Sequence, residues 1–279
     1  MAGRGAHAET SDVPSPRTAW SVHNKKELAT WHSCHGALVS DATAYMAAPV
    51  TERRLVLFGD SITESWRGTS YGRKIPRAVG VRGVLNTTLG RRWPSPLPLG
   101  IAADCTQHLL WRMAHGELSP AMAADPRLTA VLLIGTNNLG KGHSVGETVR
   151  GIVACAHYLL NATRGRLLVN ALLPRGDTRR GRGSKRKGRG ALGFVEDIAA
   201  VNAALNGSLQ NELAVTFPER VRYVDCGASF HSVAQPMDTM KARRDVVRRE
   251  LMPDRLHPNA AGHQLWGECL VGALVSAAW

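Results

Sequence analysis

The chain has 279 residues, 44% hydrophobic and 20% charged, a balance typical of one soluble α/β domain with a buried core. Its net charge of +13 is concentrated in residues 175–190 and 241–250, so basicity belongs to two segments and not to the whole fold. The apolar run 269–279 is too short to span a bilayer, and the absence of Cys-x-x-Cys spacing argues against a metal or redox site.

The amino-terminal residues 1–18 are rich in Gly, Ala, Ser and Pro, which predicts a disordered tail before a single domain at 19–279. Residues 25–46 predict one or two helices. Beyond them, short apolar runs alternate with helical patterns, which indicates a parallel sheet covered on both faces. The predicted strands are 54–58, 81–85, 131–134, 167–172 and 221–224, and the helices between them include 107–113, 145–160 and 194–205.

The basic segment 175–190 contains no apolar residue, which predicts a flexible insertion. It is either a solvated surface loop, an attractor of an anionic substrate or surface, or a nucleic-acid or nuclear-address segment. No aromatic residue interleaves the charges, so stacking on single strands is not supported and nucleic acid is the less favoured partner. The side chains that would steer an anionic substrate are Arg179, Arg180, Lys185, Arg186 and Lys187.

The five cysteines are odd in number and widely scattered, which predicts buried free thiols in a reducing compartment. Residues 1–20 lack the apolar core of a signal peptide. Glycosylation sequons at Asn86, Asn161 and Asn206 favour a secretory route instead. The compartment therefore stays open, with the cytoplasm slightly favoured.

Three short motifs follow predicted strands: residues 59–61 (Gly-Asp-Ser), 135–138 (Gly-Thr-Asn-Asn) and 254–258 (Asp-Arg-Leu-His-Pro). In parallel α/β sheets the active crevice lies at the carboxyl ends of the strands. We therefore expect the three motifs to converge at one edge of the sheet. Together they supply the parts of an acyl-transfer hydrolase.

Ser61 is the candidate nucleophile, because a serine at a strand-to-helix turn exposes its hydroxyl near a helix N-terminus. The alternative is an ordinary helix cap. His257 is the candidate base, since Asp254 lies three residues earlier and can accept from its Nδ1–H. The alternative there is a capping aspartate and a surface histidine. Three other histidines lack a carboxylate so placed: His143, His231 and His263.

Asn137 carries an amide that can donate to a developing oxyanion, whereas Asn138 is interpreted as structural. The alternative for Asn137 is a simple turn residue.

Taken together, these motifs resemble the signature blocks of the SGNH (GDSL-type) hydrolases. The likeness extends to the catalytic subunits of intracellular platelet-activating-factor acetylhydrolases and covers about residues 31–266. Trp31 and His35 fit it. Its most specific stretches are 100–104, 107–112, 116–118, 135–138 and 172–176.

The resemblance implies a flavodoxin-like three-layer αβα sandwich with five parallel strands. It also implies a serine esterase without metal or cofactor that hydrolyses small acyl, often acetyl, esters of a lipid or carbohydrate. By matching position, Ser61 is the nucleophile, Asn137 an oxyanion donor, and Asp254 with His257 completes the triad. A homodimer is a further expectation.

Two positions depart from the family pattern. Ala103 replaces a glycine whose backbone N–H lines the oxyanion hole together with that of Ser61, and alanine resists positive φ. Arg255 stands where glycine or an apolar residue is usual. Two alternatives to the esterase therefore remain, namely a binding protein with weakened catalysis and an O-acyltransferase with the same triad.

Overall fold

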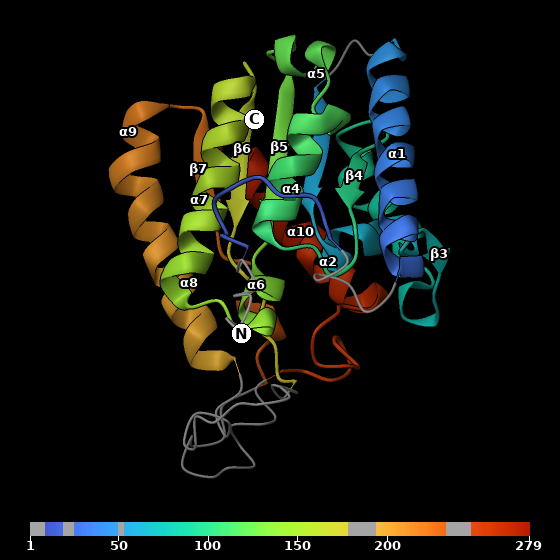
Figure 1. Ribbon diagram of the computed structural model, residues 1–279, viewed down its shortest axis with the longest axis vertical. Coiled ribbons are helices and arrows are strands. Elements are labelled where there is room, and N and C mark those ends of the chain that lie inside the picture. Colours follow the sequence, from blue (N-terminus) through green and yellow to red (C-terminus); the bar gives the residue numbers. More distant parts are fainter. Residues whose placement is uncertain (1–8, 19–24, 50–52, 178–193, 233–246) are drawn as a thin grey trace, which may run out of the picture.

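A computed structural model describes residues 9–18, 25–49, 53–177, 194–232 and 247–279. A five-stranded parallel sheet forms its centre, with helices on both faces (Figure 1). The strand order is β4-β1-β5-β6-β7, which is the doubly wound order 2-1-3-4-5 of flavodoxin-like proteins. The predicted fold class is confirmed. The strands are β1 (Arg54–Gly59), β4 (Leu97–Gly100), β5 (Leu128–Leu133), β6 (Arg166–Asn170) and β7 (Val221–Val224).

Helices α4 and α7 lie in front of the sheet in Figure 1, and α10 lies behind it. A small antiparallel hairpin, β2 (Thr69–Ser70) with β3 (Arg73–Lys74), stands apart from the sheet. The helices are α1 (Lys25–Ala47), α2 (Ser61–Glu64), α3 (Val81–Thr87), α4 (Thr106–Arg112), α5 (Pro120–Ala124), α6 (Thr136–Lys141), α7 (Val145–Ala162), α8 (Val195–Ser208), α9 (Ala214–Thr216) and α10 (Ala260–Ser276). Short 3-10 or π turns are η1 (Ser65–Arg67), η2 (Pro76–Ala78), η3 (Leu89–Arg91), η4 (Met113–Glu117), η5 (Leu209–Leu213) and η6 (Ala228–Phe230).

One predicted strand is wrong: residues 81–85 lie in helix α3. Val81 and Leu85 are buried while Arg82 is exposed, so the burial follows a helical spacing of four. The true second strand of the sheet is β4, which contains Pro98 and ends at Gly100. Both residue types are unfavourable in strands, and Pro98 is tolerated because β4 is an edge strand with one neighbour.

The amino-terminal prediction also needs correction. Residues 1–8 lie outside the described residues, but 9–17 pack against the domain, with Ser11 and Arg17 buried. The segment is polar in composition, yet its contacts are specific hydrogen bonds to buried groups such as Thr106. We call residues 9–17 the amino-terminal arm.

The cysteine prediction is wrong for two of the five residues. Cys226, just after β7, forms a disulfide with Cys269 of α10, whereas Cys34, Cys105 and Cys155 are free. Disulfides are typical of oxidising compartments, so this pairing argues against the reducing compartment that the scattered cysteines suggested. No helix in the described part of the chain is long and apolar enough to cross a bilayer.

We expect the disulfide to contribute to stability by restricting the unfolded chain. Replacing Cys226 and Cys269 together with serine should lower the free energy of unfolding by about 4 kcal/mol, given their separation of 43 residues. Chemical denaturation under non-reducing conditions measures this change. Dithiothreitol should shift the wild-type midpoint and leave the double variant unchanged; a reductant-insensitive wild type contradicts the prediction.

Candidate active site

Strand β1 delivers Ser61 to the carboxyl edge of the sheet. It ends at Gly59, where a Cβ atom would lie 2.2 Å from Thr63 Oγ1 and 2.3 Å from the Leu133 carbonyl, so a side chain does not fit. Asp60 then caps the short helix α2 by accepting from the Ile62 N–H. This tight turn places Ser61 at the helix N-terminus.

Ser61, His257 and Asp254 form one hydrogen-bonded chain. The Ser61 Oγ lies 2.9 Å from His257 Nε2, and His257 Nδ1 lies 2.7 Å from Asp254 Oδ2. Because the carboxylate accepts a hydrogen bond from Nδ1–H and so keeps the proton on that nitrogen, Nε2 is the acceptor for the serine hydroxyl. The structure thus brings together side chains separated by 196 residues.

The Asp254–His257 turn is built by the aspartate itself. Its Oδ1 accepts from the backbone N–H groups of Leu256 and His257, at 3.0 and 2.7 Å. Burial opposes ionisation of Asp254, but the ring and backbone hydrogen bonds from His257 outweigh it and hold the pKa of the carboxyl well below its usual range. Arg255, inside the turn, has φ +64°. Asp254 is therefore ionised at any pH at which His257 can act as a base.

Two of the three rival histidines, His143 and His263, have hydrogen-bond partners outside the triad. His263 is buried, with its two ring nitrogens 3.0 Å from the Asn259 carbonyl and 3.3 Å from the Ile62 carbonyl. Burial lowers the pKa of His263 to about 4. His143 lies 2.6 Å from the Ser11 hydroxyl, and His231 is exposed after β7.

The loop after β4 carries Ala103 in the left-handed region, at φ +62°. Among the described residues, no acceptor takes the backbone N–H of Ser61 or of Ala103. The Asn137 amide nitrogen contacts the Ala103 neighbour: it lies 2.9 Å from the Asp104 carbonyl and 3.2 Å from Asp60 Oδ2. Two free N–H donors and one side-chain amide thus lie on the loops that follow β1, β4 and β5.

Asn138, next to this amide, is buried and holds the start of α4. Its Oδ1 accepts from the Thr106 N–H at 3.0 Å, and its Nδ2 donates to Thr106 Oγ1 at 2.9 Å. These contacts fit the structural interpretation of Asn138.

A buried charge cluster lies beneath these loops. Arg112 of α4 donates to the Gly59 carbonyl at 2.9 Å. The same guanidinium lies 2.8 Å from Asp104 and 2.9 Å from Glu117. Asp104 also accepts from Trp31 Nε1 at 2.8 Å. These residues lie in stretches that carry the family resemblance, but the sequence alone gave them no role.

Arg175, at the described start of the basic segment, packs inside the fold and does not extend into solvent. Arg175 is buried, donates to the Thr136 carbonyl at 2.8 Å, pairs with Asp177 at 2.6 Å and stacks 3.8 Å above the Phe194 ring. The prediction of a flexible insertion is therefore wrong for Arg175, because its charge is matched inside the fold. The five steering candidates, Arg179, Arg180, Lys185, Arg186 and Lys187, lie outside the described residues.

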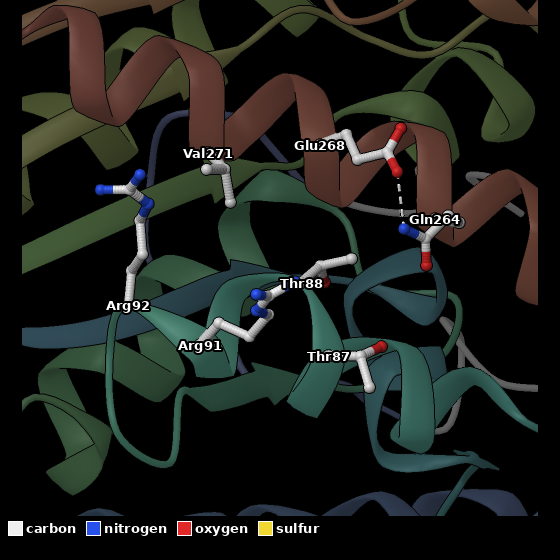
Figure 2. A pocket seen from close by; sticks show the side chains of 7 residues that line it. All are labelled: Thr87, Thr88, Arg91, Arg92, Gln264, Glu268 and Val271. Atoms are coloured by element: carbon white, nitrogen blue, oxygen red, sulfur yellow. Dashed lines mark hydrogen bonds between the residues drawn. The ribbon is translucent and has the colours of Figure 1, made fainter.

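A cavity of about 640 Å³ lies between α3, η3 and α10. Figure 2 shows the side chains that line it. Arg91 and Arg92 border it on one side, and Gln264 and Glu268 are hydrogen-bonded to each other on the other. None of the triad residues lines it. Within the described ranges, no group of three or more His, Cys, Asp or Glu side chains could hold a metal ion.

The sequence model of the GDSL-like Lipase/Acylhydrolase family matches residues 57–265, about three quarters of the chain. The chain belongs to this family. The resemblance predicted from the three motifs is confirmed, and the matched region includes Ser61, Asn137 and His257.

Similarity to individual proteins is consistent with membership of this family. Platelet-activating factor acetylhydrolase IB subunit alpha1 from Bos taurus is 30% identical over 148 residues, or 52% of each chain. The chain thus spans about half the length of that relative. A GDSL-like lipase from Bacteroides thetaiotaomicron has a TM-score of 0.62 at 16% identity, over 87% of this chain and 98% of its own. An acetylxylan esterase from Geobacillus stearothermophilus has a TM-score of 0.50 at 15% identity, over 81% and 94%. These two structures share the fold.

Asp60, beside the serine, is expected to make stability depend on pH. Burial raises its pKa to about 7, so the folded protein keeps a proton that the unfolded chain loses above pH ~4. The unfolding free energy of the wild type should therefore fall as pH rises from 5 to 8. The side chain of Asp60→Asn is neutral at both pH values. From pH 5 to pH 8, the unfolding free energy of this variant should therefore rise relative to that of the wild type by an amount on the order of 2 kcal/mol. Urea denaturation at both pH values measures this, and a constant difference contradicts it.

Proposed function

We propose that the protein is a serine esterase that hydrolyses small acyl esters, with acetyl the favoured acyl group. The observation that carries the proposal is the hydrogen-bonded chain of Ser61, His257 and Asp254, with links of 2.9 and 2.7 Å. A hydroxyl, an imidazole and an ionised carboxylate in this order are the parts of nucleophilic acyl transfer. Membership of a lipase and acylhydrolase family supports it.

In the acylation step, the Ser61 oxygen attacks the ester carbonyl while His257 Nε2 takes the hydroxyl proton. Asp254 holds the ring in the tautomer that leaves Nε2 free and stabilises the imidazolium. His257 then gives the proton to the departing alcohol, and the acyl group stays on Ser61. Water then attacks the acyl carbonyl and gives a proton to His257. The bond between the acyl carbon and the Ser61 oxygen breaks, His257 returns the proton to that oxygen, and the acid leaves.

The tetrahedral oxyanion needs donors that are already in place. The N–H groups of Ser61 and Ala103 are suited to this, because neither is taken by a described acceptor. Asn137 Nδ2 is the third donor. Of its two contacts, the one to Asp60 Oδ2, at 3.2 Å, is longer, and that hydrogen is the one that an oxyanion would share.

The alcohol part of the substrate is a lipid or a carbohydrate. Relatives point both ways, because one is named a platelet-activating factor acetylhydrolase and another an acetylxylan esterase. An acetyl ester is common to both names. These similarities therefore support an acetyl group as the acyl part of the substrate more strongly than they support either kind of alcohol part.

Two other functions use the same fold. A binding protein with weakened catalysis is favoured by Ala103 in a glycine position, and an O-acyltransferase would send the acyl group to a sugar hydroxyl. Retention of Ser61, Asp254 and His257 in bonding contact favours an active enzyme. Product analysis with and without an acceptor sugar separates hydrolysis from transfer.

The nucleophile is tested by Ser61→Ala with p-nitrophenyl acetate as substrate. We expect kcat/KM to fall by at least about 10³-fold, because acyl transfer loses its attacking atom. Ser276→Ala, which alters an exposed serine at the end of α10, is the control and should keep wild-type rates. Equal rates for Ser61→Ala and wild type would eliminate the enzyme in favour of the binding protein.

Substrate steering by the basic segment is tested by replacing Arg179, Arg180, Lys185, Arg186 and Lys187 with glutamine. If these charges attract an anionic ester, kcat/KM should fall severalfold for an anionic ester and stay constant for a neutral one. The loss should shrink at high salt, since exposed charges are screened there. Unchanged, salt-independent rates on both esters would reject steering and favour a solvated loop.

A further inference from the structure

Ala103 holds a backbone conformation that its side chain disfavours. Its φ of +62° lies in the left-handed region, which glycine adopts freely and alanine does not. Alanine keeps this conformation only where surrounding contacts impose it.

The residue before Ala103 is held from both sides. The Ala102 N–H donates to Glu64 Oε2 at 2.8 Å, and the Ala102 carbonyl accepts from Arg17 Nη2. The carbonyl of Ala102 and the N–H of Ala103 belong to one planar trans peptide and point in opposite directions. The guanidinium that fixes the carbonyl therefore also aims the Ala103 N–H.

Arg17 and Glu64 each have further hydrogen-bond partners that fix their side chains. Arg17 donates through Nε to Asp104 Oδ1 at 2.9 Å and through Nη1 to the Tyr71 hydroxyl at 2.8 Å. It is 2% exposed. Glu64 accepts from the Gly72 N–H at 2.8 Å and from the Thr69 hydroxyl at 3.0 Å, and it too is 2% exposed.

We propose that Arg17 and Glu64 are positioning residues for the oxyanion hole. Arg17 holds the Ala102–Ala103 peptide through its carbonyl, and Glu64 holds the preceding Ile101–Ala102 peptide through its N–H. Together they act as a clamp and impose on Ala103 the backbone that a glycine would adopt unaided. The amino-terminal arm is therefore part of the active-site architecture, although it lies far from Ser61 in sequence. This inference rests on the proposed esterase function, because it assigns Ala103 N–H to the hole.

The clamp differs from a purely structural ion pair in one respect. If Arg17 serves to hold Ala103 at positive φ, its loss should matter less when residue 103 is glycine. If Arg17 only compensates the buried charge of Asp104, its loss should be felt equally with either residue. A double-mutant cycle between positions 17 and 103 separates the two.

The cycle uses Arg17→Lys, which keeps the charge beside Asp104 but loses the guanidinium fork. With p-nitrophenyl acetate, we expect Arg17→Lys to lower kcat about tenfold and to leave KM within about twofold of wild type. The loss in kcat should be smaller than the roughly 10²–10³-fold loss that follows removal of a whole oxyanion donor, because the Ala103 N–H is displaced and not removed. Ala103→Gly alone should stay within about threefold of wild type. In Ala103→Gly, the further substitution Arg17→Lys should lower kcat less than about threefold.

The control is Arg150→Ala. Arg150 is exposed and pairs with Asp12 of the same arm at 3.7 Å, away from the loop, so kcat should not change. Glu64→Gln, which alters the contact to the Ala102 N–H, repeats the cycle should Arg17→Lys fail to fold. A wild-type kcat in Arg17→Lys, or the same loss with alanine and glycine at position 103, overturns the proposal.

Hydrogen exchange measured by mass spectrometry follows the clamp without substrate. The 101–105 segment should exchange faster in Arg17→Lys than in wild type, and unchanged exchange overturns the clamp whatever the activity. Failure of the proposed function looks different: Ser61→Ala then equals wild type, while the exchange of this segment still responds to Arg17→Lys.

Discussion

The buried carboxylate of Asp104 is the constraint on which the site depends. A charge without exposure must be compensated, and here Arg17, Arg112 and the Trp31 indole surround it. Each partner comes from a different element: the amino-terminal arm, α4 and α1. Arg112 also holds the Gly59 carbonyl, two residues before the serine. One charge thus fixes the loop after β4 and the end of β1 in a common frame.

A second tie acts at the other side of the site. The segment after β6 holds the loop after β5, because Arg175 donates to the Thr136 carbonyl at 2.8 Å. It also holds the turn before α10, because the Gly176 N–H donates to the Arg255 carbonyl at 2.9 Å. The turn that carries the triad histidine is therefore held by the segment after β6 as well as by its connection to α10. The parts of the site come from distant segments, but each is fixed by a neighbour that is itself buried.

The convergence of the three motifs could be predicted from the sequence because parallel strands bring their carboxyl ends to one edge, whatever their separation along the chain. The error at 81–85 has a local cause, since an apolar run of five residues fits a strand or a helix turn, and burial against α10 decides between them. The sequence pattern does not predict strand β4, because Pro98 and Gly100 are residue types that are unfavourable in strands. The contacts of the amino-terminal arm and the Cys226–Cys269 disulfide form between segments that are distant in the sequence. Composition and spacing do not indicate which arginine pairs with a buried carboxylate or which two cysteines lie close enough to bond.

The two departures from the family pattern share one physical solution. Ala103 and Arg255 both have positive φ, at +62° and +64°. The resemblance implies glycine at the first position and glycine or an apolar residue at the second. In each case a backbone carbonyl is held. Arg17 holds the carbonyl of Ala102, next to Ala103, and the Gly176 N–H holds the carbonyl of Arg255 itself. The backbone geometry thus survives the substitution because tertiary contacts replace the freedom of glycine.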